Sequence, residues 1–384
     1  MIRNIVGAAV TAEDFFGREK EIKQGLNKLK NGNSLMLSAP RRVGKTSFSK
    51  KMIELLEKEG WIGIFIDMEH LKTELELYKE LANKLNEKRE TLPRITNNVK
   101  HALSDLSVSF KEFGLKIGSA FDRQALRKDV LKVINNKEHP INLLFVFDEL
   151  AVFLNNVTND GADPDKAKDF LNSLRSIRQE SEGRALWIFC SSISIENYLF
   201  QYNLTASMND TLDFHIGEMP EQEAYGLLKE LAEGAHITIP EGTQEYILKR
   251  LGLALPYNIQ GLFSEIVDNV EDNVVVTNKD VDNAYHQLIS NSPHMKTWYE
   301  RLNDYGNTGL ELKIILRFLC QQPEPVSIDR IFDSAFSSHE ESDLEHLRTL
   351  IQLLIHDGYI IPDNDNKLTF RMNLLKDYWK YYNL

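Results

Sequence analysis

The stretch SAPRRVGKTSFSK, residues 38–50, indicates the fold of this chain. An apolar run at 35–37 predicts a short buried strand before it, and apolar residues at helical spacing predict an amphipathic helix after it. Between the two, Gly44, Lys45 and Thr46 have the order that a phosphate group requires, because backbone N–H groups at a helix start face the anion. Lys45 can reach the β- and γ-phosphates of a nucleotide, and Thr46 can hold Mg²⁺. The stretch therefore predicts a phosphate-binding loop.

Two features of this loop leave alternatives open. The complete pattern G-x-x-x-x-G-K-[ST] has glycine where this chain has Ala39, and a chance Gly-Lys-Thr at a helix start is the competing interpretation. Arg41 and Arg42 lie beside the expected phosphates. Either one of them stabilises phosphate charge within the same chain, or both pair with carboxylates and brace the loop. The flanking strand and helix favour the phosphate loop.

A second motif, LLFVFDE at residues 143–149, supports that interpretation. Its consecutive apolar residues predict a strand buried on both faces, which is typical of a parallel sheet. Two carboxylates stand at the C-terminal end of the strand, where α/β sheets bind ligands. We expect Asp148 to hold Mg²⁺, mostly through water, and Glu149 to polarise an attacking water molecule. The alternative is a strand that ends in a solvated acidic turn.

Length and composition are typical of a water-soluble intracellular enzyme. The 384 residues allow two or three domains, and a hydrophobic content of 42% is ample for a core. No apolar stretch approaches about 18 residues, and the N-terminal segment lacks a long apolar core, so we expect a mature cytoplasmic protein without a membrane span. Cys190 and Cys320 fit a reducing compartment and have no metal-ligand spacing. The net charge of −12 argues against broad binding to nucleic acid, although a local basic patch stays open.

The predicted elements divide the chain into three blocks. Apolar runs within 35–37, 62–67, 143–149 and 185–190 predict four strands within residues 1–214, with helices between them. This alternation predicts an α/β fold with a doubly wound parallel sheet as the core that carries the phosphate loop. Within this block, residues 108–117 are expected to form a small hairpin or a paired extended insert. Residues 215–292 are predicted to form a helical lid that ends in a linker. Residues 305–384 have the pattern of a winged helix-turn-helix, with three helices followed by two short strands.

Motifs in this order resemble those of the archaeal-type ATPases of bacteria and archaea, which are P-loop proteins related to the STAND and origin-recognition branches of the AAA+ ATPases. The similar stretches are FGREKE at 16–21, PRRVGKTS at 40–47, the Asp148-Glu149 pair, Ser191-Ser192, and Leu255-Pro256-Tyr257. The resemblance covers residues 13–270, and relatives commonly carry a C-terminal winged helix. It implies an ATPase that uses ATP and Mg²⁺.

The resemblance also implies roles for single residues. Phe16 and Gly17 would lie near the adenine, and Pro256 would close over it from the lid; the alternatives are a core aromatic residue and a simple helix start. Ser192 would sense the γ-phosphate or would only cap its strand. The phosphate-binding residues that the resemblance carries over are Arg41, Arg42, Val43, Gly44, Lys45, Thr46 and Ser47.

Arg175 and Arg178 are three residues apart on the helix predicted after the acidic strand, so they share a face. In AAA+ relatives, an arginine from this region often reaches the γ-phosphate of a neighbouring subunit, where it stabilises charge in the transition state. The alternative is a solvated helix face. Both arginines are therefore candidate catalytic residues beside Lys45, Glu149 and Ser192.

The C-terminal block is acidic. Residues 310–384 hold eight basic and twelve acidic side chains, a balance of −4. A helix that reads DNA presents Arg, Lys, Asn or Gln to the bases, so we favour a winged helix that contacts protein or is autoinhibitory over one that binds DNA. Two functional hypotheses follow. The first is an ATP-dependent switch whose nucleotide state controls homo-oligomerisation or a partner effector, as in host antiviral defence. The second is a DNA-associated ATPase, such as a loader or a transposition regulator.

Overall fold

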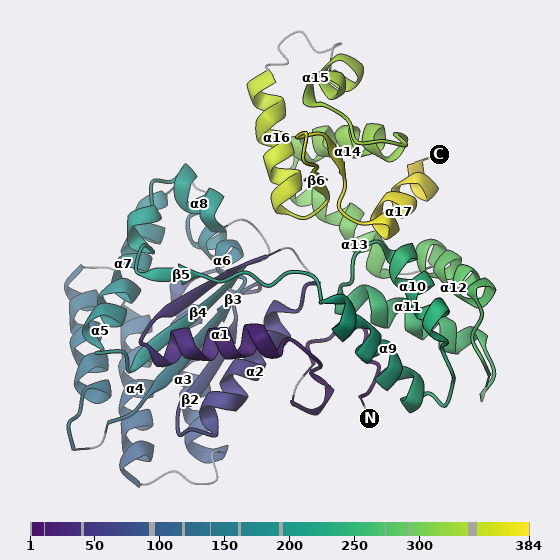
Figure 1. The fold of residues 1–384 in the computed structure, drawn as a ribbon. Coiled ribbons are helices and arrows are strands. Elements are labelled where there is room, and N and C mark those ends of the chain that lie inside the picture. The colour runs from purple at the N-terminus through teal and green to yellow at the C-terminus, as the bar shows by residue number, and fades with distance from the viewer. Residues whose placement is uncertain are drawn as a thin grey trace. The chain divides into compact units, whose positions relative to one another are not determined.

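The structure, a computed structural model, divides into two compact units (Figure 1). The sheet unit comprises Glu19–Ala39 and Lys45–Ile216, and the helical unit comprises Met1–Arg18, Pro40–Gly44 and Gly217–Leu384. The chain thus passes from the helical unit to the sheet unit at the peptide that follows Gly44, inside the predicted phosphate loop. The structure describes residues 2–10, 12–39, 42–91, 97–116, 120–138, 140–159, 163–191, 195–272, 274–291, 293–336 and 344–383.

A five-stranded parallel sheet forms the centre of the sheet unit. Its strands are β1 (Ser34–Ser38), β2 (Ile62–Asp67), β3 (Leu143–Asp148), β4 (Ala185–Ser191) and β5 (Thr211–Asp213). Their order across the sheet is β2-β3-β4-β1-β5, so the chain crosses over two strands after β1 and over β1 itself after β4. This order confirms the predicted doubly wound parallel sheet. The sequence did not predict β5, because its three residues, TLD, lack an apolar run.

Helices flank this sheet (Figure 1). They are α1 (Glu19–Lys30), α2 (Lys45–Glu57), α3 (Glu74–Thr91), α4 (Asn97–Lys116), α5 (Ala120–Ile134), α6 (Leu150–Val157), α7 (Pro164–Glu180) and α8 (Ile195–Gln201), with a 3-10 turn, η2, at Thr205–Ser207. Every residue of β3 and β4 is buried, as their apolar sequences predict for strands covered on both faces.

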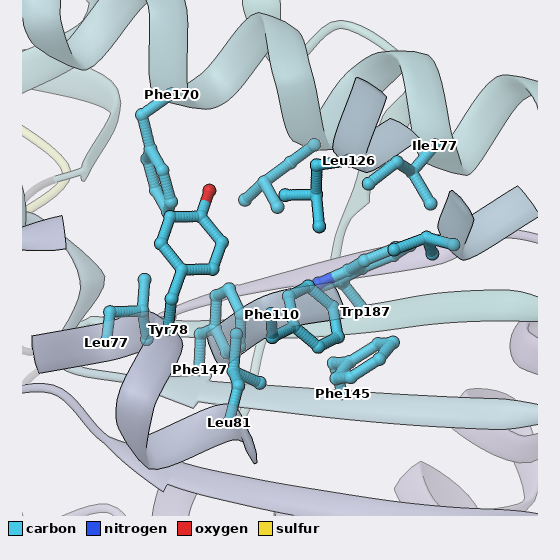
Figure 2. A pocket seen from close by; sticks show the side chains of 12 residues that line it. Leu77, Tyr78, Leu81, Phe110, Leu126, Phe145, Phe147, Phe170, Ile177 and Trp187 are labelled. Carbon is cyan, nitrogen blue, oxygen red and sulfur yellow. The ribbon is translucent and has the colours of Figure 1, made fainter. Parts of the chain in front are cut away.

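Aromatic side chains fill the space between the sheet and helices α3, α4, α5 and α7 (Figure 2). The rings of Phe145 and Trp187 stack with centroids 5.0 Å apart, and Tyr78 meets Phe113 edge to face at 4.7 Å. A void of about 10 Å³, roughly one water molecule, remains among them. Because strand β3 contributes Phe145 and Phe147 to this dense core, the carboxylate at its end has a rigid support.

The expected hairpin at residues 108–117 was wrong, because the structure shows α4 through residue 116. The predicted pattern came from the apolar–polar–apolar triplets at 108–110 and 115–117, yet the Val108 and Leu115 side chains that begin them are exposed. The buried apolar residues of α4 are instead spaced three and four apart, which is the period of a helix. They are Leu103, Leu106, Phe110 and Phe113. Ile117, the last residue of the predicted insert, lies outside the described residues.

The helical unit contains further helices, most of them within residues 215–292, the range for which a lid was predicted. They are α9 (Glu221–Gly234), α10 (Glu241–Leu251), α11 (Pro256–Asn269), α12 (Asn278–Asn291) and α13 (Pro293–Arg301), with 3-10 turns η1 at Ala12–Asp14 and η3 at Leu302–Tyr305. Pro256 takes the first helical position of α11, where its missing N–H has no cost. The predicted linker is short, since α13 starts two residues after α12 ends.

The C-terminal part of the helical unit contains helices and a hairpin. Its elements are α14 (Asn307–Cys320), α15 (Ile328–Ile331), a π-helical segment η4 (Phe332–Phe336), α16 (Leu344–His356), β6 (Ile360–Pro362), β7 (Leu368–Phe370) and α17 (Asn373–Asn383). Strands β6 and β7 are antiparallel, and the Asp363 carboxylate between them accepts the N–H groups of Asp365 and Lys367 at 2.9 and 2.8 Å. The hairpin predicted for this region is confirmed.

Helix α17 contacts helices α10 and α12. The Tyr285 hydroxyl of α12 donates to Asp377 at 3.0 Å, and Asn373 donates to the Lys249 carbonyl at 3.3 Å. These contacts explain why helices α9 to α13 and the C-terminal elements form one compact unit. Across the described ranges, no helix has the length and apolarity that crossing a membrane requires.

Candidate functional site

The turn between β1 and α2 has the geometry of a phosphate loop. Gly44 has φ +100°, and a Cβ there would meet nothing within 4 Å, so backbone conformation and not crowding demands the glycine. Helix α2 begins at Lys45, and the N–H groups of its first turn lack partners within the helix. Lys45 is 6% exposed, and its ammonium donates to the Ala39 carbonyl on the other arm of the loop. The buried ammonium of Lys45 therefore belongs to the first residue of the helix whose N–H groups can bind an anion.

Two oxygen ligands meet beside this lysine. The Thr46 hydroxyl donates to the Asp148 carboxylate at 2.6 Å, although 102 residues separate the two in the chain. Asp148 is buried at the end of β3, and burial raises the pKa of its carboxyl against the lowering effect of the Thr46 hydrogen bond. Hydroxyl and carboxylate oxygens are the ligands that Mg²⁺ prefers, so the pair fits that ion.

Glu149 follows with a backbone that few residues adopt. Its φ of 59° and ψ of 44° are left-handed, and it occupies the N-cap position of α6 without a side-chain capping hydrogen bond. Such a conformation costs about 1 kcal/mol or more and is common where a site needs a side chain turned in a particular direction. Asp67 at the end of β2 pairs in register with Asp148, and the charges of Glu149 and Asp67 both raise the pKa of Asp148 further. Sequence reasoning missed Asp67, whose strand-end position was the available signal.

The structure describes two of the four remaining loop and strand-end residues that the sequence singled out. Ser47 is half-buried in the first turn of α2, and Ser191 is buried at the end of β4. Arg41 and Ser192 lie outside the described residues. No group of three or more His, Cys, Asp or Glu side chains that could hold a metal ion occurs within the described part of the chain.

Arg175 and Arg178 share a face of α7, as predicted, but they bind within their own unit. Arg178 binds Asp210 with two hydrogen bonds of 2.8 and 2.7 Å, and its side chain is 3% exposed. Arg175 donates to the Ala206 carbonyl at 2.7 Å. The solvated-face interpretation is therefore wrong for Arg178, and its ion pair also occupies the group that would reach a neighbouring subunit.

In the helical unit, Gly17 and Arg18 of the FGRE motif pack closely against Glu223 of α9. Gly17 has φ +69°, and a Cβ on it would lie 2.4 Å from the Glu223 carboxylate, so no other residue fits without a shift. The Arg18 N–H donates to that carboxylate at 2.7 Å. The Arg18 guanidinium is buried, and its Nη2 donates to the carbonyls of Val43 and Gly217 at 2.9 and 2.8 Å. Sequence reasoning missed Arg18 as a contact of the loop, although the motif contained it.

The predicted adenine residues lie on or beside helices α9 and α11. Phe16 packs on α9, where a Cβ at Gly226 would be 2.9 Å from its ring. The lid motif contributes Tyr257, which follows Pro256 in the first turn of α11. Whether Phe16, Gly17 and Pro256 contact adenine stays a prediction.

Arg42 joins the loop to this lid motif. Its guanidinium lies 4.3 Å from the centre of the Tyr257 ring, a cation–π contact, and its backbone has φ +70°. Burial raises the pKa of Tyr257 to about 12 against the opposing effect of Arg42, so the ring is a neutral phenol near pH 7. The sequence left open that Arg42 pairs with a carboxylate to brace the loop, whereas the structure shows it on an aromatic ring.

Comparison with known proteins places this geometry in a fold. No protein-family model matches the sequence, and no curated protein matches it. The Walker-type ATPase of Pyrococcus abyssi superimposes with a TM-score of 0.73 at 17% identity, over 98% of this chain and 99% of that one. The ORC2 protein of Aeropyrum pernix gives 0.56 at 13% identity in its ADPNP-ADP complexes, over 96% of each chain, and 0.51 at 13% identity in its ADP form, over 97% of each. The fold is therefore that of Walker-type and ORC-type proteins.

Proposed function

We propose that this protein binds ATP with Mg²⁺ and hydrolyses it as a molecular switch. The observation that carries the proposal is the 2.6 Å contact between Thr46 and Asp148 beside Lys45. It brings a helix-start hydroxyl and a strand-end carboxylate together at the C-terminal edge of a parallel sheet, where such folds bind ligands. The phosphates of a nucleoside triphosphate supply negative charge that would pair with the buried Lys45 ammonium.

The side chains divide the work of hydrolysis. Lys45, the N–H groups of the loop and Ser47 bind the phosphates, and Thr46 and Asp148 hold the cation, which neutralises charge on the phosphates when bound. Glu149 orients a water molecule and takes its proton as the water oxygen bonds to the γ-phosphorus, while the bond from that phosphorus to the β,γ-bridging oxygen breaks and ADP leaves with the electron pair. Ser192 remains the proposed γ-phosphate sensor, and Phe16, Gly17 and Pro256 remain the proposed adenine contacts.

The division of the loop supports a switch. Of the described loop residues, 42–44 group with the helical unit, and Lys45–Ile216 group with the sheet unit. A change in the loop between ATP and ADP would therefore act on residues of both units. We propose that this change exposes a surface for self-association or for a partner effector, with Arg175 as the remaining candidate to reach a neighbouring phosphate.

We propose the cytoplasm as the place of action, since Cys190 and Cys320 are both buried and free of disulfides. Host antiviral defence is the setting that the family resemblance implies. A winged helix formed by α14 to α17 would serve in this scheme as a protein-contacting module.

A single assay separates this proposal from the DNA-associated alternative. Phosphate release from ATP is measured with Mg²⁺, with EDTA, and with Mg²⁺ plus duplex DNA. The proposal predicts Mg²⁺-dependent release that duplex DNA leaves unchanged, whereas strong stimulation by DNA would favour a loader or transposition regulator. Absence of any release and of any ATP binding would overturn both.

Self-association of the switch is tested by measuring the molecular mass of the protein in solution. The Glu149→Gln protein, which should retain ATP, is expected to gain mass in light scattering with Mg²⁺ and ATP, and Arg175→Ala should reduce that gain. A monomer under all nucleotide conditions would leave a switch that acts within one chain and would return Arg175 to a solvated face.

A further inference from the structure

The buried guanidinium of Arg18 contacts the backbone of the phosphate loop. Arg18 is 2% exposed, and its Nη2 atom gives its two hydrogens to two main-chain carbonyls. One belongs to Gly217, where the chain enters the helical unit, and the other to Val43 in the phosphate loop. This end of the guanidinium is thus directed at backbone, and one of the backbone groups lies in the loop itself.

Binding the Val43 carbonyl fixes a neighbouring donor. The peptide between Val43 and Gly44 is planar and trans, so its C=O and N–H point in opposite directions. Since the carbonyl points to Arg18, the Gly44 N–H points away from Arg18. If this peptide flipped, the loop would present a carbonyl oxygen where an anion needs a donor.

The backbone around this peptide has the pattern of an anion nest. Arg42 has φ +70° and Gly44 has φ +100°, whereas Val43 between them is not left-handed. Alternation of this kind turns successive N–H groups toward one concave side, which binds anions. Val43 is fully buried, so its side chain anchors the peptide that Arg18 orients.

Helix α9 holds Arg18 in turn. The Glu223 carboxylate accepts the Arg18 N–H at 2.7 Å, and it lies so close to Gly17 that a Cβ there would be 2.4 Å away. Gly17 and Arg18 both have positive φ, 69° and 61°, so the carboxylate offsets the cost of a strained turn. This turn directs the Arg18 guanidinium toward the Val43 carbonyl of the loop.

We propose that Arg18 is a positioning residue for nucleotide phosphate: it sets the Val43–Gly44 peptide so that the Gly44 N–H faces the phosphate, and Glu223 keeps it there. This proposal rests on the proposed nucleotide binding and adds to it how the loop is preorganised. The alternative is that Arg18 only ties the helical unit together, which would make it a stability residue with no effect on the direction of that N–H.

The Gly44 amide can be observed directly. Valine labelled with ¹³C at the carbonyl, combined with ¹⁵N-glycine, selects Val-Gly pairs, and the sequence has two, Val6–Gly7 and Val43–Gly44. A Val6→Ile variant removes the first signal and assigns the second. In the full chain, saturating Mg²⁺ and ADP should move the Gly44 amide proton downfield, because it then bonds to a charged oxygen.

Arg18→Ala is expected to abolish that downfield shift and to weaken ADP binding about tenfold or more, as loss of a charged hydrogen bond predicts. Arg18→Lys keeps the positive charge but loses the planar guanidinium that binds two carbonyls, so it should retain part of the downfield shift that Arg18→Ala loses. Glu223→Ala should give a smaller loss than Arg18→Ala, and Glu233→Ala, an exposed carboxylate on the same helix, should give none. If Arg18→Ala does not fold in a urea titration, Arg18→Lys and Glu223→Ala decide through the same signal.

The outcomes separate the two proposals. A wild-type protein that binds no ADP would overturn the proposed function and this inference together. A wild-type protein that binds ADP, with a Gly44 shift that stays the same in folded Arg18 and Glu223 variants, would overturn this inference alone.

Discussion

The two halves of the phosphate loop differ in what holds them. Lys45 and Thr46, in the sheet unit, contact Ala39, which directly follows β1, and Asp148, which ends β3, so their partners lie at the C-terminal ends of strands of one parallel sheet. Arg42 and Val43, in the helical unit, contact Tyr257 and Arg18, which lie in motifs before and far after the loop.

This difference suggests a division of labour. The sheet half carries the groups for chemistry on the phosphates, and the helical half carries the groups that set the shape of the loop. Variants in the two halves should therefore fail in different ways.

The largest effect should come from the sheet half. Glu149→Gln keeps the shape of the side chain but removes the carboxylate that accepts a proton, so hydrolysis should fall by about 10²–10⁴. Affinity for Mg²⁺ and ATP should stay within about twofold, since glutamine adds no charge repulsion. Single-turnover phosphate release and a fluorescent-nucleotide titration measure the two quantities. Normal turnover in this variant would remove Glu149 from the mechanism.

The paired arginines of α7 distinguish structure from catalysis within the sheet unit. Arg178→Ala leaves Asp210 without its buried partner and should lower the free energy of unfolding by about 3 kcal/mol. Arg175→Ala removes a bond to one carbonyl near the surface and should cost less than about 1 kcal/mol. Urea unfolding of both variants measures this. Equal losses would contradict the contrast between a buried pair and a surface contact.

A smaller effect is expected from the helical half. Tyr257→Leu removes the ring that holds Arg42, a contact of about 0.5–2 kcal/mol, so ATP affinity should fall several-fold with the hydrolysis rate of bound ATP preserved. Tyr257→Phe retains the ring face and serves as the matched control, with a change of less than about twofold. If the leucine variant slowed bound-state hydrolysis instead, the loop halves would not divide shape from chemistry.

The smallest effect should be that of duplex DNA on the C-terminal elements. The acidic balance of residues 310–384 predicts no salt-sensitive binding of the full chain, because few phosphate counterions would be released. Fluorescence anisotropy with labelled duplex at several salt concentrations tests this. Tight binding that weakens steeply with salt would contradict the protein-contact interpretation.

The sequence predicted most of the core because its signals are local. Apolar runs predicted four of the five strands, and the Gly44-Lys45-Thr46 order and the acidic end of β3 predicted the pair that meets at Thr46 and Asp148. Strand β5 was missed since three half-exposed residues carry no periodicity, and α4 was taken for a hairpin because two exposed apolar residues imitated alternation.

The contacts of the helical half could not be predicted in the same way. Nothing in the spacing of Arg18, Val43 and Glu223 shows that a guanidinium and a carboxylate converge on one turn, since tertiary structure alone brings them together. Arg178 shows the same limit, because its partner Asp210 follows α8 and gives no sequence pattern.

Calorimetric titration of Mg²⁺ and ATP into the wild-type protein and Lys45→Ala tests the central claim most directly. Lys45 is the buried cation at the start of α2, so its loss should abolish measurable binding. Lys51→Ala, a lysine of the same helix that pairs with Glu54 at 2.9 Å, should bind like wild type. Equal affinity in wild type and Lys45→Ala would contradict the assignment of this loop as the nucleotide site.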